Sequence, residues 1–206
     1  CGHWPVGTAP RGNIRPVQPR KHQQVMTKDK LNQEQVFMLA PAPAADSPQR
    51  YAADTLAMIV GDDSGSRFYW ALVDPGLADS ADMSFHDYEG TGSYFTSFSC
   101  DPENTQDNLA LIQEILREVQ REGVSDEELA VAKSKILSRV VRGSERPMGR
   151  MQALGMGWTY LKTYRSVDEE LANFDAVSLK GIRDVLDSFP FDEMTVLALG
   201  LLAKLE

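Results

Sequence analysis

Histidine and cysteine are scarce in this chain. Of its 206 residues, three are histidines and two are cysteines. The histidines, His3, His22 and His86, are far apart in sequence. A zinc site of the kind built on one helix needs two histidines one helical turn apart, so this chain alone does not form one. Two cysteines, Cys1 and Cys100, are too few for a disulfide framework, and we expect Cys100 to be a buried thiol, although a bond between the two stays open.

Long apolar runs are also lacking. The longest, Met194 to Ala203, is interrupted by Gly200 and falls short of the ~20 residues that a membrane span needs. No signal peptide is visible, and a chain that opens at Cys1 is expected to be a processed product or a piece of a longer protein. We therefore expect a soluble protein of the bacterial cytoplasm or periplasm.

Acidic residues are absent from residues 1–28, which carry a charge of +5, although the whole chain has a net charge of −9. The rest of the chain is therefore strongly acidic and would repel phosphate backbones, which disfavours nucleic-acid binding. Residues 1–30 are predicted to be a basic linker or arm plus an entry strand, because residues 1–21 are rich in proline and glycine. This arm is either solvated or seated on an acidic surface. Residues 31–206 are predicted to form a single α+β domain.

Alternating side chains predict the strands. The runs 83–89 and 94–99 alternate in pattern and are joined by Gly90, Thr91 and Gly92, which predicts an antiparallel hairpin. Residues 33–40 are apolar on both faces, which favours a central strand. Residues 194–199 are predicted to be the closing strand.

Helical spacing and caps predict the remaining elements. One helix is expected to start at Asp46, Ser47 and Pro48 and to stop at Gly61, and the apolar spacing of residues 109–119 predicts another that ends at Gly123. Capping boxes and a serine cap then predict three further helix starts, at Ser125 with Glu128, at Ser166 with Glu169, and at Ser178. The predicted fold class is α+β, a mainly antiparallel sheet with helices packed on one face.

Residues 147–158 contain three methionines and three glycines, after a break expected between Gly143 and Pro147. Two interpretations stay open. The segment is core at a crowded helix crossing, which we favour, or it is an adaptable contact surface.

Three motifs follow one another in a recognisable order. They are S-R-F-x-x-x-L-x-x-x-G-L-A at residues 66–78, D-P-E-N at 101–104 after the hairpin, and S-D-E-E-L-x-x-A-K at 125–133. Together they resemble the pitrilysin/insulinase (inverzincin) family of zinc metallopeptidases. The resemblance runs from about Gln33 to the C-terminus.

The resemblance implies a two-domain enzyme. Members of the family have two similar α+β domains, and only the first carries H-x-x-E-H, whose histidines bind zinc while its glutamate acts as general base. This chain lacks that motif and is similar to the second, C-terminal and non-catalytic domain, which closes over the first and helps to hold the peptide. We therefore expect no catalytic residues, no metal and no cofactor in this chain, and inactivity in isolation. Zinc is expected in the partner catalytic domain.

The expected partners follow from the same resemblance. They are an H-x-x-E-H domain on the same or another chain, a peptide substrate, and a second copy in a homodimer. The alternative is a scaffold or binding protein that kept the fold without proteolysis.

Many second domains of the family hold substrate through an Arg and a Tyr in L-R-x-x-x-G-L-x-Y. Here Val73 and Asp79 align with those two positions, so both side chains are missing. Arg67, Tyr69 and Tyr88 lie nearby in sequence and are the predicted substitutes as substrate-binding residues. The competing interpretation makes Tyr69 core and Arg67 a surface cation.

Overall fold

A five-stranded sheet organises the part of the chain that the structure, a computed structural model, describes: residues 3, 7 and 20–205. The strand order is β1-β5-β2-β4-β3. Most of the predicted arm, residues 1–21, lies outside the described residues. The strands are β1 (His22–Thr27), β2 (Glu34–Ala42), β3 (Ser80–Tyr88), β4 (Thr91–Cys100) and β5 (Thr195–Gly200).

Three of the four strand pairs are antiparallel, which confirms the predicted fold class. β3 and β4 form the expected hairpin, and β2 lies at the centre between β4 and β5. The exception is β1, which pairs parallel with β5. β1 lies within the segment predicted as arm plus entry strand, and the domain boundary at residue 30 stays a prediction.

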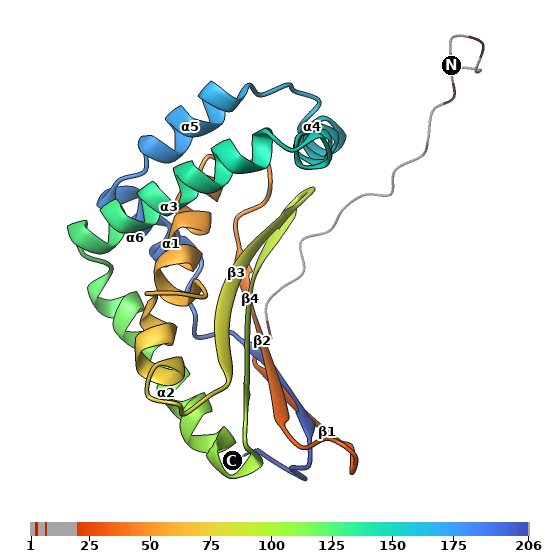
Figure 1. Cartoon of the computed structure of the whole chain (residues 1–206), viewed down its shortest axis with the longest axis vertical. Helices are drawn as coiled ribbons and strands as arrows, with labels where there is room; N and C mark the ends of the chain where they lie inside the picture. Colours follow the sequence, from red (N-terminus) through yellow and green to blue (C-terminus); the bar gives the residue numbers. More distant parts are fainter. Residues whose placement is uncertain (1–2, 4–6, 8–19, 206) are drawn as a thin grey trace.

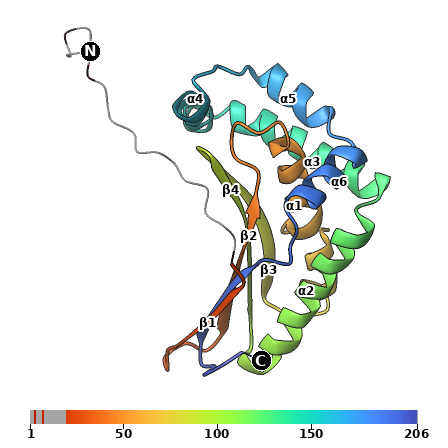
Figure 2. The ribbon, with the colours of Figure 1, turned by 180° about the vertical axis from the view of Figure 1, so that it is seen from behind.

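Helices cover one face of this sheet (Figures 1 and 2). Alternation along the strands decides which face, because Val36 and Met38 of β2 and Tyr94 and Phe98 of β4 all point into the buried layer. The helices are α1 (Arg50–Gly61), α2 (Thr105–Glu122), α3 (Asp126–Ser144), α4 (Pro147–Leu161), α5 (Val167–Asp175) and α6 (Leu179–Ser188), with a short π-helix, η1 (Tyr69–Val73), and a 3₁₀ turn, η2 (Pro102–Asn104).

Local sequence signals fix most helix ends. Ser125 and Ser166 each form the predicted capping box, in which the serine hydroxyl accepts a hydrogen bond from the N3 backbone. α2 ends at Gly123, whose φ of 82° suits a residue without a Cβ. The start of α1 differs from the prediction: residues before Arg50 form turns, so Asp46 and Ser47 precede the helix.

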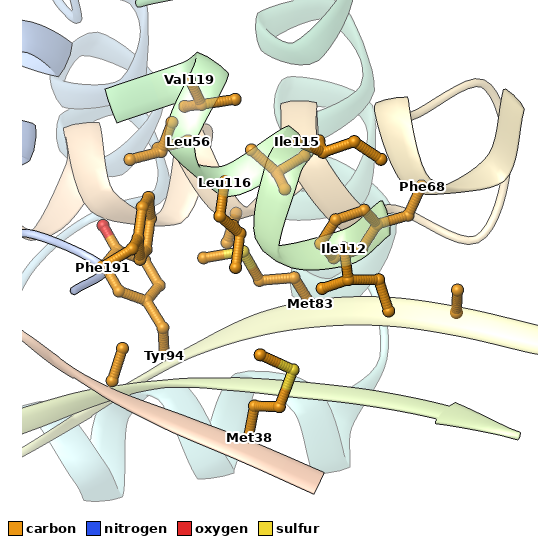
Figure 3. Packing of buried hydrophobic residues seen from close by; sticks show 14 of the residues in the cluster. Met38, Leu56, Phe68, Met83, Tyr94, Ile112, Ile115, Leu116, Val119 and Phe191 are labelled. Atoms are coloured by element: carbon orange, nitrogen blue, oxygen red, sulfur yellow. The ribbon is translucent and has the colours of Figure 1, made fainter. Parts of the chain in front are cut away.

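The core lies between the sheet and the helices (Figure 3). Leu56 of α1 and Ile112 and Leu116 of α2 are at most 1% exposed and pack over β2, β3 and β4. Each such side chain stabilises the fold by about 1.5–3 kcal/mol. Tyr94 is buried among them with no hydrogen-bond partner for its hydroxyl among the described residues, and burial raises its pKa well above the usual value.

A buried carboxylate fixes the end of β5. Glu34 is fully buried at the start of β2, and its Oε2 accepts hydrogen bonds from the backbone nitrogens of Leu201 and Leu202 at 2.9 and 3.2 Å. The adjacent Gly200 leaves the space that this carboxylate occupies. The C-terminal end of β5 is thereby held to the start of β2.

The segment 147–158 is not core, so the favoured interpretation of its methionines is wrong. The predicted break is present, since α3 ends at Ser144 and α4 starts at Pro147. None of the residues of α4 is buried, however. The reason is position: α4 lies beyond the tips of β3 and β4, where the sheet has ended (Figure 1).

Gly61, at the end of α1, provides a test of this packing. A Cβ at Gly61 would overlap the backbone nitrogen and Cβ of Met83 in β3, so alanine must push α1 off the sheet. We expect Gly61→Ala to lower the free energy of unfolding by about 1–3 kcal/mol in urea titrations. Gly143→Ala is the control, because a Cβ there meets nothing and alanine favours the helix, and a loss there as large as that of Gly61→Ala would contradict the explanation.

Candidate functional site

The sheet face opposite the helices carries apolar side chains. The rings of Phe37 in β2 and Phe95 in β4 lie 5.7 Å apart on this face, and Leu39 is 44% exposed. Leu197 and Leu199 of β5 continue the surface toward β1. Within the described residues no helix covers this face, which we call the open face (Figure 2). Leu39 is exposed and the other four side chains are half-buried, and apolar surface that is only partly covered in this way is typical of an interaction site.

The open face continues onto the hairpin. The ring of His86 lies 6.5 Å from that of Tyr88 in a stacked arrangement and 6.3 Å from that of Phe95. The Nε2 atom of His86 is 3.1 Å from the hydroxyl of Ser84, which limits how the imidazole can turn. Tyr88 is 45% exposed, so part of its side chain is available to a ligand.

A hollow of about 1090 Å³ lies at the hairpin end of the sheet. Its walls combine apolar surface from Leu39 and Phe189 with charges from Arg20 and Glu193. The two edge strands of the described sheet are β1 and β3, and an edge strand can pair with an extended peptide through its backbone. The face and its edges thus offer apolar contacts and main-chain hydrogen bonds. The lining residues are Arg20, His22, Leu39, Ala40, Pro41, Ala42, Ala44, Gly90, Thr91, Gly92, Ser93, Ser188, Phe189, Pro190, Glu193 and Thr195.

Arg67 lies with the helices and is engaged in an ion pair. Its Nε and Nη2 atoms donate to the two carboxylate oxygens of Glu128 at 2.7 and 3.0 Å, and Nη2 also donates to the carbonyl oxygen of Gly123. The hydrogen bond and charge of Glu128 raise the pKa of Arg67. This arginine joins the segment before η1 to the start of α3, and its side chain is only 21% exposed.

Tyr69 and Tyr88 lie in different surroundings. Tyr69 is a partly buried residue of η1, and its ring meets that of Trp70 edge-on with centroids 5.0 Å apart. Tyr88 is on the open face, at the hairpin. The structure therefore does not bring Arg67, Tyr69 and Tyr88 together in one wall, and their role in substrate binding stays a prediction.

Phe37, Leu39 and Phe95 were not predicted from the sequence as site residues. The signal was present, because residues 33–40 are apolar on both faces and only one face can be taken by the helices. That pattern predicts a strand at the centre of the sheet. It also indicates an uncovered apolar surface.

Residues 1–136 match the family model described as the Peptidase M16 inactive domain. The chain belongs to this family. It is 24% identical over 181 residues to an uncharacterized zinc protease of Mycobacterium tuberculosis, which covers 83% of this chain and 41% of the relative. The M16 inactive domain thus spans less than half the length of that relative.

Solved structures share the fold. The peptidase M16 inactive domain from Pseudomonas fluorescens superposes with a TM-score of 0.85 at 17% identity, over 97% of this chain and 48% of that one. A chain of complex III2 from Candida albicans gives a TM-score of 0.85 at 14% identity, over 98% of this chain and 51% of that one. The M16 inactive domain is non-catalytic, and its family implies a catalytic partner domain.

Zinc does not fit the described residues of this M16 domain. No group of three or more His, Cys, Asp or Glu side chains among them is arranged to hold a metal ion. His22 lies on β1 and His86 on β3, at opposite edges of the sheet. Relatives named zinc proteases therefore point to zinc in the catalytic partner. As for the membrane, the helices of the described segments are too short or too polar to cross it.

The pair of Arg67 and Glu128 predicts a pH dependence of stability. Burial raises the pKa of Glu128, but hydrogen bonds from Arg67 and the Ser125 backbone outweigh it, so the pKa is lowered from 4.5. The ionised carboxylate therefore stabilises the native state above the unfolded pKa, and this contribution is lost as pH falls through the lowered value. Glu128→Gln removes the charge and keeps the cap.

We expect Glu128→Gln to lower the free energy of unfolding by about 1–2 kcal/mol near pH 7 and by much less near pH 3. Glu114→Gln is the control, because its pair with Arg117 is well exposed and contributes at most about 1 kcal/mol. Denaturant titrations across pH measure both. A loss from Glu128→Gln that is the same at both pH values would contradict the ion-pair explanation.

Proposed function

We propose that this domain closes a peptide chamber over a separate H-x-x-E-H zinc domain, with the open face as one wall. The observation that carries the proposal is the apolar surface around Phe37, Leu39 and Phe95, which lies opposite the helices. In water such a surface is costly to expose, and an extended peptide or a facing domain would bury it. Proteolysis would then belong only to the full enzyme.

The contribution of this domain to the reaction would be binding and water exclusion. Apolar side chains of the open face would take up substrate side chains, and an edge strand would hold the peptide backbone. Tyr88, which is 45% exposed and whose ring stacks near that of His86, is the polar residue of this surface that we expect to contact a peptide. Zinc, when bound in the partner domain, would supply the activated water.

A second candidate is a scaffold that retains the fold and does no proteolysis. The similarity to a chain of complex III2 from Candida albicans supports it, because there the fold occurs as part of a larger assembly. One simple observation distinguishes the two candidate functions. An H-x-x-E-H motif elsewhere on the same polypeptide, or on a chain that copurifies, favours the peptidase, and absence of both favours the scaffold.

We expect the isolated chain to be inert. Its three histidines are too far apart in sequence for an H-x-x-E-H site, so the purified chain should neither bind zinc tightly at 1:1 nor hydrolyse peptides. Metal analysis and a fluorogenic peptide assay with and without chelator measure this. Stoichiometric zinc together with chelator-sensitive hydrolysis would contradict the assignment as a non-catalytic domain.

The open face is tested in the full enzyme, or in the complex if the catalytic domain is a separate chain. We expect Leu39→Ser and Tyr88→Ala to raise KM about three- to tenfold with little change in kcat, because they remove binding contacts away from the zinc. Trp70→Gln is the control, since Trp70 is 62% exposed but lies near α1 and α3.

The earlier candidates are tested in the same assay with Arg67→Ala and Tyr69→Phe. Because Arg67 holds Glu128, we expect the first variant to change thermal unfolding more than KM. An unchanged KM for both Leu39→Ser and Tyr88→Ala, in proteins that unfold at the wild-type temperature, would exclude the open face as a peptide wall.

A further inference from the structure

α4 is an apolar helix that the rest of the described domain leaves uncovered. Met148, Met151 and Trp158 are 63%, 59% and 60% exposed, and no residue of this helix is buried. A helix of about 15 residues is marginal in water without tertiary packing. The exposed side of α4 is therefore a surface that needs a partner.

Three of the exposed side chains lie close together around the helix. At about 100° per residue, Met148, Met151 and Trp158 fall within an arc of about 80°, while Met156, which is 49% exposed, lies about 80° to the other side of Met148. Gly155 lies between them in this arc, and a Cβ there would meet no atom within 4 Å. The surface is thus a shallow dent at Gly155 with methionine and tryptophan around it. Both are residue types suited to docking, since Met adapts its shape and Trp is frequent at binding hot spots.

The opposite side of α4 is fastened to the chain that follows it. Arg150 donates hydrogen bonds to the hydroxyl of Tyr164 at 3.0 Å and to the carbonyl oxygen of Arg165 at 3.5 Å. Its guanidinium also lies over the Tyr164 ring, 5.6 Å from the centroid. These contacts fix the rotation of the helix, so the side with Met148, Met151 and Trp158 stays outward.

We propose that this side of α4 is the docking surface for the catalytic partner domain, a proposal that rests on the proposed function. Two observations choose this occupant. The chain spans 41% of its mycobacterial relative, so most of such a protein lies outside the structure. In addition, α4 lies past the tips of β3 and β4, at the rim of the open face, where a domain facing that surface would make contact (Figures 1 and 2).

Charge argues against a second copy of this chain in a twofold contact. Residues 142–165 hold five cations and one acid, in a chain whose net charge is −9. A symmetric contact would bring two such basic segments together, and like charges at an interface are costly. The partner surface that fits is apolar with carboxylates around it. The cations are Arg142, Arg146, Arg150, Lys162 and Arg165.

Methionine oxidation by peroxide tests this directly, because its rate follows exposure. In the full enzyme, or in the complex, we expect Met148 and Met151 to oxidise about tenfold more slowly than the same residues in the dilute isolated chain. The isolated chain is the reference because Met26, which is 50% exposed, pairs with Leu199 and lies on the open face. Mass spectrometry of tryptic peptides gives each rate.

Two results would overturn the proposal. One is oxidation of Met148 and Met151 in the full enzyme at the same rate as in the dilute isolated chain. The other is protection that already occurs in the isolated chain and rises with its concentration, which would assign the surface to a second copy.

Gly155→Gln fills the dent and is the sharpest variant. It should not disturb the domain, because the position is open and glutamine favours a helix over glycine. We expect thermal unfolding of the isolated chain to be unchanged, while Met148 in the full enzyme oxidises as fast as in the dilute isolated chain. Val131→Gln is the control, because Val131 is 50% exposed on α3.

The variant also separates this inference from the proposed function. If Gly155→Gln leaves Met148 protected, the docking surface is wrong. If Gly155→Gln exposes Met148 and peptide hydrolysis falls as well, the docking surface on α4 and the proposed closing of the chamber are both supported. If Met148 is protected in the wild-type enzyme yet Leu39→Ser and Tyr88→Ala have no effect on KM, the docking surface stands and the peptide wall fails.

Discussion

Alternation of side chains along β2 and β4 is the constraint on which the rest of the domain depends. A strand has two faces, and the helices pack on the face that carries Met38, Tyr94 and Phe98. The other face is apolar as well, at Phe37 and Phe95. The helices therefore bury only one of the two apolar faces of the sheet. A non-catalytic domain of a peptidase family has a use for the remaining half, since a facing domain or a peptide can bury what the helices do not.

Polar groups in this domain mainly hold segments together. Arg67 reaches from the segment before η1 to Glu128 at the start of α3, and Glu34 holds the backbone just after β5. The negative charge of the chain, by contrast, is spread over exposed helix positions and creates no cluster able to hold a metal among the described residues. Arg67 and Glu34 therefore act within the domain, as links between segments far apart in sequence.

The sequence predicted what local signals encode. The hairpin, the central strand and the two capping boxes each arise from residues close together in the chain, and each is present in the structure. The ion pair of Arg67 could not be predicted from the sequence, because its partner Glu128 lies 61 residues further along the chain. The burial of α4 was predicted wrongly because a run of methionines reports that a surface is apolar, not whether its partner belongs to the same domain. The open face was missed for a similar reason.

The pairing of β5 has a consequence for how the domain is made. β5 supplies the second neighbour of β2 and the only described neighbour of β1, and it comes at residues Thr195–Gly200. During synthesis β2 is present long before β5, so one edge of the central strand waits unpaired, and Glu34 is without the backbone nitrogens it will bind. Contacts of such long sequence separation slow folding, and an apolar strand with an open edge is prone to pair with other chains. The sheet is therefore completed late, when β5 pairs with β1 and β2, the two strands that are synthesised first.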